Sequence, residues 1–422
     1  ESEVRLLLHE LEAGTGKNAK LGREIVEKCV EAQYETSFAL GIYHDVLVFE
    51  SDIVRTIFKE GLEAISKSPA IVKEAEGKNA GCLVAKMSGG EFEGMESPDK
   101  VLIRSDGTAT YTGKDVIFQL WKFGLLKSNF KYEKFIEQPT DEKKRKIAYK
   151  TGGKAGENEK SGKIGAKASL SFGSAGKVIN VIGMEQAYPQ KVIAEIFRAL
   201  GHGKQAANSI HLAYEHVGLE DAKFSGREGT WIGFTADELI EEGKKRAYEK
   251  IKKEMGDEEK RAVSSAVAIG AIRFSMLRVA PEKRITFRWE EALNFEGDSA
   301  PYIMYAHARC CRILEKAKAA NAKKPKSKSP YPYTQHEKEL LKLIAQYPET
   351  VQKAASAYRP NVIADYALDI AAAFGRFYDT SPVLAEGVQP EARKARLQIV
   401  NAAKGSLAKS LSLLGIAAIE KM

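Results

Sequence analysis

Residues 101–126, VLIRSDGTATYTGKDVIFQLWKFGLL, decide the fold that we expect for this chain. Residues 101–105 favour a strand, and the pair Asp106-Gly107 is typical of a two-residue hairpin turn, which needs positive φ. Residues 108–112 favour the returning strand because β-branched and aromatic side chains dominate them. The apolar residues that follow recur at helical spacing, which predicts a helix. Strands that lead into a helix in this way indicate an α/β domain.

Tyr111 and Asp115 stand where this second strand ends and the helix begins. We expect both to face the crevice at the carboxyl end of the strands, where open α/β sheets bind ligands. A carboxylate accepts two guanidinium hydrogens side by side, and a phenol adds an apolar wall and one hydrogen bond. A purely structural role also fits, because Asp is favourable in a first helical turn and Tyr is common in strands.

The composition suits a cytoplasmic protein and a polyanionic partner, but it does not prove either. The 422 residues allow more than one domain, and the net charge of +8 with a pI near 9.0 suits binding to nucleic acid. The four cysteines lack metal-ligand spacing, as in a reducing compartment. No membrane-spanning run or secretory signal is visible. The first residue, Glu1, indicates a missing N-terminal segment.

The sequence before the hairpin predicts helices over residues 1–75, with a strand-like run at 45–49. Ser51 and Asp52 are expected to cap the helix over residues 53–67, because their oxygens can accept the free amides of a first turn.

After the hairpin, residues 127–177 are polar and rich in glycine, which predicts a mobile segment or a small β insertion. Residues 178–183 form a near-continuous apolar run, which predicts a strand buried on both faces. Gln186 lies at the carboxyl end of that strand. Its amide can bind a ligand there, or Gln186 can be an ordinary loop residue. A helix is predicted over residues 189–201, because Pro189 and Gly201 stand at the two ends where each residue is favoured.

Residues 223–230, KFSGREGT, form a basic loop. Lys223 and Arg227 can neutralise phosphate oxygens, and the backbone near Gly226 can approach them closely. A capping box at residues 235–238 predicts the start of the next helix.

From residue 236 to the end, the apolar periodicity predicts a helical bundle. Tyr305 and Arg309 share one helix face, and an aromatic ring beside an arginine is a suitable platform for an unstacked base. A tyrosine at this spacing equally fits the bundle core.

Together these stretches resemble the class I arginine–tRNA ligases of the archaeal type, in chain order and to the last residue. The matching stretches are HDVLVFESDIVR at 44–55, the hairpin and helix of 101–126, VIGMEQAYPQ at 181–190, the loop at 223–230, YAHARC at 305–310, FGRFYDTSPVL at 374–384 and LLGIAAIEKM at 413–422. The loop is similar to the lysine-methionine-serine signature of the class, although phenylalanine replaces the methionine and glycine the second lysine.

The resemblance implies a fold of two types: the second half of a class I Rossmann nucleotide-binding domain with a helical insertion, followed by a helical-bundle anticodon-binding domain. The implied domains are a connective insertion at 1–85, the Rossmann half with its signature loop at 86–235, stem-contact helices at 236–290 and the anticodon-binding domain at 291–422.

The resemblance also implies roles for individual residues. Arginine would be bound by Tyr111, Asp115 and Gln186. ATP would be bound by Lys223, Ser225, Gly226 and Arg227, of which Lys223, Ser225 and Arg227 would act in catalysis. The tRNA anticodon would be bound by Tyr305, Arg309, Tyr378 and Met422.

The implied function is arginine–tRNA ligation by a monomer that uses ATP with Mg²⁺, L-arginine and tRNA(Arg), with no protein-bound metal and no membrane partner. The class's His-x-Gly-His motif does not occur in this sequence. The resemblance covers about the last two-thirds of a full enzyme, which predicts an open sheet edge and an open apolar face. The alternatives are a truncated, inactive tRNA-binding fragment, one half of a split synthetase, or a generic α/β nucleotide-binding protein with a helical RNA-binding tail.

Overall fold

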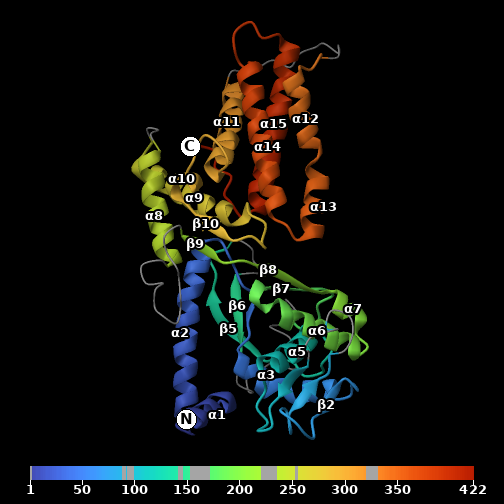
Figure 1. Cartoon of the computed structure of the whole chain (residues 1–422). Coiled ribbons are helices and arrows are strands. Elements are labelled where there is room, and N and C mark those ends of the chain that lie inside the picture. Colours follow the sequence, from blue (N-terminus) through green and yellow to red (C-terminus); the bar gives the residue numbers. More distant parts are fainter. Residues whose placement is uncertain are drawn as a thin grey trace, which may run out of the picture. The chain divides into compact units, whose positions relative to one another are not determined.

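The computed structural model of the chain describes residues 2–87, 92, 99–140, 146–152, 172–219, 235–251, 255–319 and 331–422. The chain divides into two compact units, Glu1–Ala213 and Tyr214–Met422 (Figure 1). The finer division into four domains stays a prediction. In the described part of the chain, no helix has both the length and the apolar character that a bilayer crossing requires.

The first unit combines short sheets with helices. Its helices are α1 (Ser2–Ala13), α2 (Lys17–Ala39), α3 (Glu50–Thr56), α4 (Phe58–Ile65), α5 (Tyr111–Lys122), the 3-10 helix η3 (Met184–Gln186), α6 (Ala187–Ala199) and α7 (Gly203–Ala207). Its strands are β1 (Val46–Leu47), β2 (Ile71–Lys73), β3 (Leu83–Ala85), β4 (Lys100–Ile103), β5 (Tyr132–Glu137), β6 (Ile147–Thr151), β7 (Val178–Gly183) and β8 (Ser209–Tyr214). They pair in the orders β1–β6–β5, β2–β3–β4 and β7–β8.

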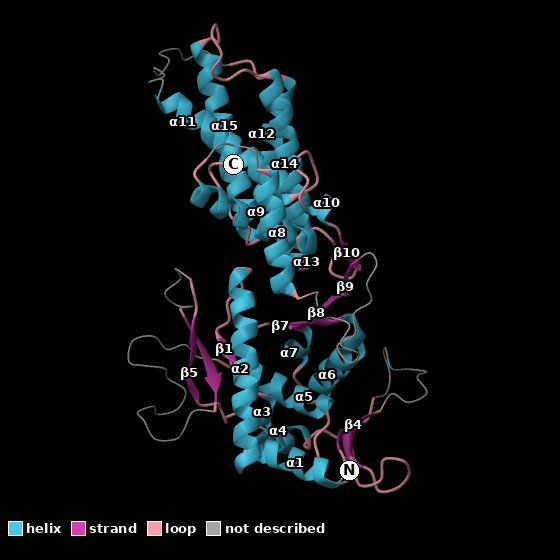
Figure 2. Ribbon diagram, turned by 90° about the vertical axis from the view of Figure 1, so that its left-hand side faces the viewer, coloured by secondary structure: helices cyan, strands magenta, loops and turns pink. Residues whose placement is uncertain are grey.

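The expected strand near residue 46 and the expected β insertion are both confirmed. Strand β1 is parallel to β6, and β6 is antiparallel to β5. Helix α2 runs along this sheet (Figure 2), and Tyr34 of α2 packs edge-on against Phe135 of β5 with ring centroids 5.7 Å apart.

The predicted capping role of Ser51 and Asp52 is wrong. Helix α3 begins at Glu50, after Phe49, and has no side-chain cap. Asp52 is instead buried and accepts hydrogen bonds from Arg23 at 3.1 Å, from Arg55 at 2.9 Å and from Thr151 at 2.6 Å. Burial of a carboxylate without hydrogen-bond donors costs more free energy than an uncapped helix end that is exposed to water. The donors around Asp52 remove this cost.

The hairpin differs from its prediction in both the turn and the second strand. Arg104 and Thr108 face each other across a longer turn, in which only Gly107 has positive φ, at 84°. The returning strand is reduced to a single bridge between Ile103 and Ala109, and α5 already begins at Tyr111. The Thr110 hydroxyl accepts from the Gly113 N–H at 3.2 Å, so this side chain starts the helix early.

Helix α5 contributes to two hydrophobic cores of the first unit, and its apolar residues form a helix as their spacing predicts. Val116 and Leu120 are almost fully buried in one core with Leu102 of β4 and Phe197 of α6. Ile117 and Trp121 belong to a second core beside α3.

Close packing of α5 on β4 requires a glycine at position 113. A Cβ there would lie 2.4 Å from the Leu102 carbonyl oxygen. We therefore expect Gly113→Ala to lower the free energy of unfolding by about 1–3 kcal/mol, because the added methyl forces the two elements apart. Denaturant unfolding measures this loss. Gly203→Ala, in α7 with open space around its Cβ position, is the matched control, and equal losses in both variants would contradict the packing argument.

Strand β7 has the predicted bounds, but it is not buried on both faces. Asn180 is 7% exposed and faces α5 and α6, where it bonds to Gln119 and Gln190. On the other face, Ile179 is 44% exposed and Val181 is 62% exposed. Among the described residues β7 pairs only with β8. The exposed residues agree with the open apolar face expected from the sequence.

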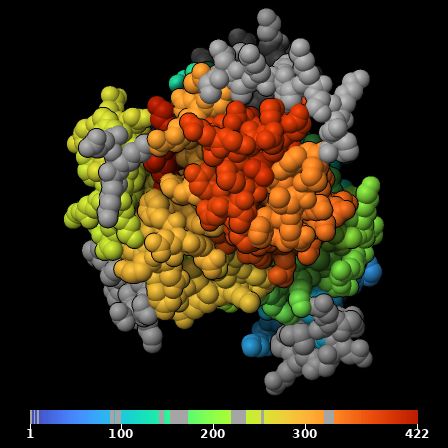
Figure 3. All heavy atoms as spheres, turned by 90° about the horizontal axis from the view of Figure 1, so that it is seen from above, coloured from blue at the N-terminus to red at the C-terminus, as the bar shows by residue number. Residues whose placement is uncertain are grey.

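The second unit is helical, as predicted. It contains α8 (Ala236–Lys250), α9 (Asp257–Leu277), α10 (Trp289–Ala292), α11 (Ala300–Ala319), α12 (Gln335–Ala345), α13 (Tyr347–Ala357), α14 (Asn361–Thr380) and α15 (Pro390–Leu413), with a parallel pair formed by β9 (Val217–Leu219) and β10 (Ile285–Phe287). The capping box of Thr235 and Glu238 is confirmed at the start of α8. Figure 3 shows α12 and α13 beside α14 and α15, and Phe374 and Phe377 of α14 and Leu407 of α15 are buried.

Candidate functional site

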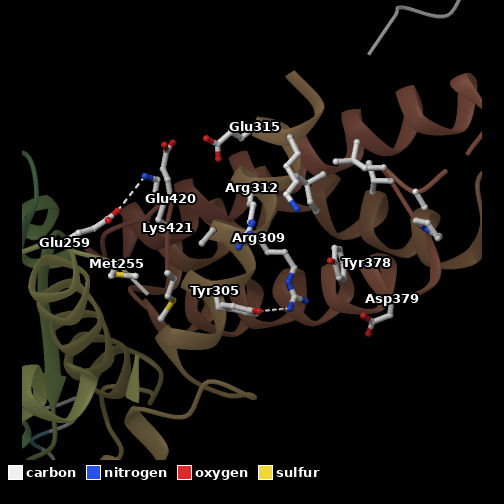
Figure 4. Close-up of a pocket in the computed structure, with 18 residues that line it drawn as sticks. Met255, Glu259, Tyr305, Arg309, Arg312, Glu315, Tyr378, Asp379, Glu420 and Lys421 are labelled. Carbon is white, nitrogen blue, oxygen red and sulfur yellow. Dashed lines mark hydrogen bonds and ion pairs between the residues drawn. The ribbon is translucent and has the colours of Figure 1, made fainter. Parts of the chain in front are cut away.

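The second unit contains a cavity of about 990 Å³, which we call the α11 pocket. Its walls come from α11, from the end of α14, from the loop after α14 and from the C-terminal segment (Figure 4). The four residues predicted to bind the anticodon all line it: Tyr305, Arg309, Tyr378 and Met422. Helix α14 and the C-terminal segment bring two of these residues to α11 from distant parts of the chain.

Arg309 lies between the two tyrosines. The guanidinium carbon is 4.6 Å from the ring centroid of Tyr305 and 4.6 Å from that of Tyr378, and Nη2 donates to the Tyr305 hydroxyl at 2.8 Å. Both rings remain about two-fifths exposed, at 40% and 41%. A planar cation held between two exposed rings presents π-faces and donors together, which is the chemistry that stacks and binds an unpaired base.

Two further cations on α11 extend the basic character of the pocket. Arg312 and Lys316 line it three and seven residues after Arg309, and both are exposed. Neither forms an ion pair within the described residues, so both charges are free to meet a phosphate. Sequence reasoning missed them, although their helical spacing from Arg309 could have revealed them.

Arg396 of α15 holds the loop after α14 by a hydrogen bond. Its Nη1 donates to the Pro382 carbonyl at 2.7 Å, and its Nε pairs with Glu337 of α12 at 2.8 Å. Glu337 is fully buried. Since Pro382 and the next three residues line the α11 pocket, this arginine fixes one of its walls.

The three residues predicted to bind arginine lie in the first unit and are all exposed. Tyr111 is the first residue of α5, is 79% exposed and lines a second cavity of about 1070 Å³. Asp115 lies one turn further along α5, and Gln186 ends η3 just before α6. The cavity of Tyr111 includes neither Asp115 nor Gln186, and no hydrogen bond among the described residues joins the three.

Asp115 nevertheless has an unusual electrostatic environment. Its carboxylate reaches solvent on one side, yet partial burial raises its pKa above the ordinary value, with Lys122 opposing the rise and Glu50 adding to it. Lys122 itself donates to Asn180 at 3.0 Å and lies 4.5 Å from the Phe118 ring centroid. Burial lowers the pKa of Lys122, and Asp115 opposes this effect. Sequence reasoning missed Lys122, which lies two helical turns after Asp115.

The predicted ATP-binding and catalytic residues, Lys223, Ser225, Gly226 and Arg227, lie outside the described residues. No group of metal-ligating side chains occurs among the residues that are described.

Two family models match the chain. The "tRNA synthetases class I (R), catalytic domain" matches residues 161–289, a range that contains Gln186 and the basic loop. The "DALR anticodon binding domain" matches residues 303–422, which contain the whole α11 helix face discussed above.

Similar proteins cover the entire chain. The arginine–tRNA ligases of Thermococcus sibiricus and Pyrococcus abyssi are 42% and 43% identical to it, each over 100% of the chain. The chain spans about 64% of the length of these relatives. Among solved structures, the Thermus thermophilus arginyl-tRNA synthetase has a TM-score of 0.82 and 34% identity, over 100% of the chain and 67% of that structure.

Proposed function

Since this chain belongs to the arginyl-tRNA synthetase family, we propose that it acts in the ligation of arginine to tRNA(Arg). In the proposed reaction, ATP with Mg²⁺ and L-arginine give arginyl-adenylate and pyrophosphate, and the arginine then passes to the terminal ribose of the tRNA. We infer that the chain works as a monomer in the cytoplasm.

The observation that carries the proposal is Arg309 held between the exposed rings of Tyr305 and Tyr378. Anticodon bases are unpaired, and they bind to aromatic and guanidinium planes of this kind. Met422 adds an apolar wall to the same pocket. We propose that this pocket receives an anticodon base, and that Arg312 and Lys316 meet the phosphates beside it.

In the first unit, Asp115 is the proposed partner of the arginine guanidinium. Tyr111 supplies an apolar wall and a hydroxyl from the same helix face, and Gln186 supplies an amide for the amino acid group of the ligand. The support is their exposure and the one-turn spacing of Tyr111 and Asp115 on α5. A carboxylate that faces a guanidinium forms a strong, charge-assisted pair.

For ATP, the proposed ligands are the residues of the basic loop, namely Lys223, Ser225, Gly226 and Arg227. Their proposed contribution is to stabilise the negative charge that develops on the departing pyrophosphate. This assignment rests on the resemblance of the loop to the class I signature.

Replacement of Arg309 tests the anticodon pocket. We expect Arg309→Leu to weaken binding of an anticodon stem–loop of tRNA(Arg) by about 10- to 100-fold, because stacking and charge are lost together. Arg309→Lys should keep the charge and recover only part of the affinity, since a lysine cannot stack as a plane. Filter binding at several salt concentrations measures both effects.

Arg261→Leu is the matched control, because Arg261 is an exposed arginine of the same unit outside the pocket. Equal affinity of the Arg309→Leu variant and the wild-type chain would show that the pocket does not bind the RNA.

Arginine-dependent and tRNA-dependent ATP–pyrophosphate exchange tests the whole proposal. Exchange by this chain supports arginine–tRNA ligation. Exchange only after addition of a second polypeptide favours one half of a split synthetase. Binding of tRNA without exchange under either condition favours a tRNA-binding fragment.

A further inference from the structure

The C-terminal segment, residues 414–422, brings Met422 into the α11 pocket although it contains no helix or strand. An irregular segment keeps one conformation only if its backbone groups are bonded to the rest of the fold. The contacts of this segment therefore determine whether the pocket is complete.

Two side chains, the half-buried Arg273 and the buried His307, bond to its backbone. At the start of the segment, Arg273 of α9 donates to the Leu414 carbonyl at 3.0 Å. Gly415 turns there with φ 67°, and a Cβ on it would lie 2.1 Å from Arg273 Nη2, so a larger residue would be strained and would displace this guanidinium. Near the other end, His307 Nδ1 lies 2.9 Å from the Ile419 carbonyl oxygen, and His307 is only 2% exposed.

The chemistry of this last contact fixes the state of the histidine. A carbonyl oxygen only accepts, so Nδ1 carries the proton and donates it. Burial lowers the pKa of His307 below its ordinary value, which keeps the ring neutral at neutral pH. The ring faces Cys311, whose sulfur is 3.8 Å from Nε2, rather than the solvent.

Two ion pairs at the surface also contact the segment. Lys404 pairs with Glu420 at 3.2 Å, and Lys421 pairs with Glu259 at 3.7 Å. The glutamate in the first pair and the lysine in the second are more than two-thirds exposed, so water and salt screen these pairs. The hydrogen bond from His307 to the Ile419 carbonyl is buried, so it is screened far less than these two pairs.

We propose that His307 is a positioning residue for RNA binding, which holds the C-terminal segment so that Met422 closes the α11 pocket. His307 lies two residues from both Tyr305 and Arg309, on the opposite side of α11. Helix α11 therefore carries Tyr305 and Arg309, the stacking platform, on its exposed side. From its buried side, His307 holds the C-terminal segment that forms the facing wall of the pocket. This inference rests on the proposed function and adds a residue that does not touch the RNA.

Substitution of His307 separates positioning from contact. His307→Leu should weaken binding of the anticodon stem–loop by about tenfold, the effect of one lost hydrogen bond. His307→Asn places an amide donor near the position of Nδ1 and should restore most of the affinity. In the exchange assay the same loss should appear in the KM for tRNA and not in kcat. His336→Asn, a half-exposed histidine of α12, is the matched control and should change neither value.

A double-mutant cycle identifies the route of the effect. If His307 acts through the segment, then deletion of residues 420–422 should remove the pocket wall, and His307→Leu should add nothing in the shortened chain. An undiminished tenfold effect in the shortened chain would overturn the proposal, as would a His307→Asn variant as weak as His307→Leu.

Hydrogen exchange gives an answer that does not depend on RNA. The amides of residues 416–422 should exchange faster in His307→Leu than in the wild-type chain, while those of α14 stay protected. Unchanged exchange in this segment would reject the positioning role. A wild-type chain that binds no tRNA would instead reject the proposed function and leave the exchange result to stand by itself.

Discussion

An Asp115→Asn variant is expected to bind arginine about 100-fold less tightly than the wild-type chain, because the guanidinium then loses its charged partner. The amide keeps the size of the side chain, so the helix should be undisturbed. Equilibrium binding of labelled arginine, with saturating tRNA present, measures the loss. Glu63→Gln in α4 removes an exposed carboxylate of the same unit and should leave the affinity unchanged. An Asp115→Asn affinity equal to that of the wild-type chain would mean that arginine binds elsewhere.

The pH dependence of arginine binding follows from the raised pKa of Asp115. In the proposed site the ionised carboxylate is the partner of the guanidinium, so affinity should fall as the pH drops through this pKa, at a higher pH than for an ordinary aspartate. Lys122 favours the ionised form. Lys122→Met should therefore move the loss of affinity to still higher pH, and a shift to lower pH would contradict this electrostatic assignment.

Glu337→Ala is expected to lower the free energy of unfolding by about 3–5 kcal/mol, since it leaves Arg396 without its partner in a buried site. Glu337 is fully buried and accepts from Arg396 at 2.8 Å, from the Tyr331 hydroxyl at 3.0 Å and from the Thr334 N–H at 2.9 Å. Denaturant unfolding followed by helix content measures the loss. The control, Glu349→Ala, removes an exposed glutamate of α13 and should cost little. A loss in Glu337→Ala as small as in the control would show that the ion pair is not stabilising.

The stabilisation by Glu337 should also depend on pH. Burial alone raises the pKa of Glu337, but the hydrogen bonds from Thr334, Arg396 and Tyr331 outweigh burial and hold this pKa below the ordinary value for a glutamate. A carboxyl group with a lowered folded-state pKa contributes stability that is fully present above its unfolded-state pKa. This contribution is lost as the pH falls through the folded-state value. The difference between wild-type and Glu337→Ala proteins should therefore be constant near pH 7 and shrink in acid.

Local patterns in the sequence predicted local structure well. The bounds of β7 and the capping box at Thr235 follow from neighbouring residues alone, and the structure reproduces both. The predictions failed where distant residues compete. Asp52 is not a cap because two of its partners, Arg23 and Thr151, lie 29 and 99 residues away in sequence. The helical periodicity near position 52 gives no information about these distant partners.

The candidate sites show the same division. Tyr305 and Arg309 share a helix face at a spacing that sequence reveals, and Arg312 follows by the same rule. Tyr378 comes from another helix, so only the family resemblance pointed to it before the structure placed it against Arg309. The apolar run of β7 predicted a strand, but periodicity could not report which face would be covered. For Asp115 and Gln186, the structure shows exposure and local charge, and their shared role stays a prediction.

Arg396 has one end on Glu337 and the other on the Pro382 carbonyl. A single side chain therefore serves the integrity of the helical bundle and the shape of the α11 pocket. Conservative substitutions of Glu337 or Arg396 should give temperature-sensitive proteins, in which the proposed binding of an anticodon base declines on warming together with the fold. Because the two traits share one arginine, neither can be adjusted at this position without the other.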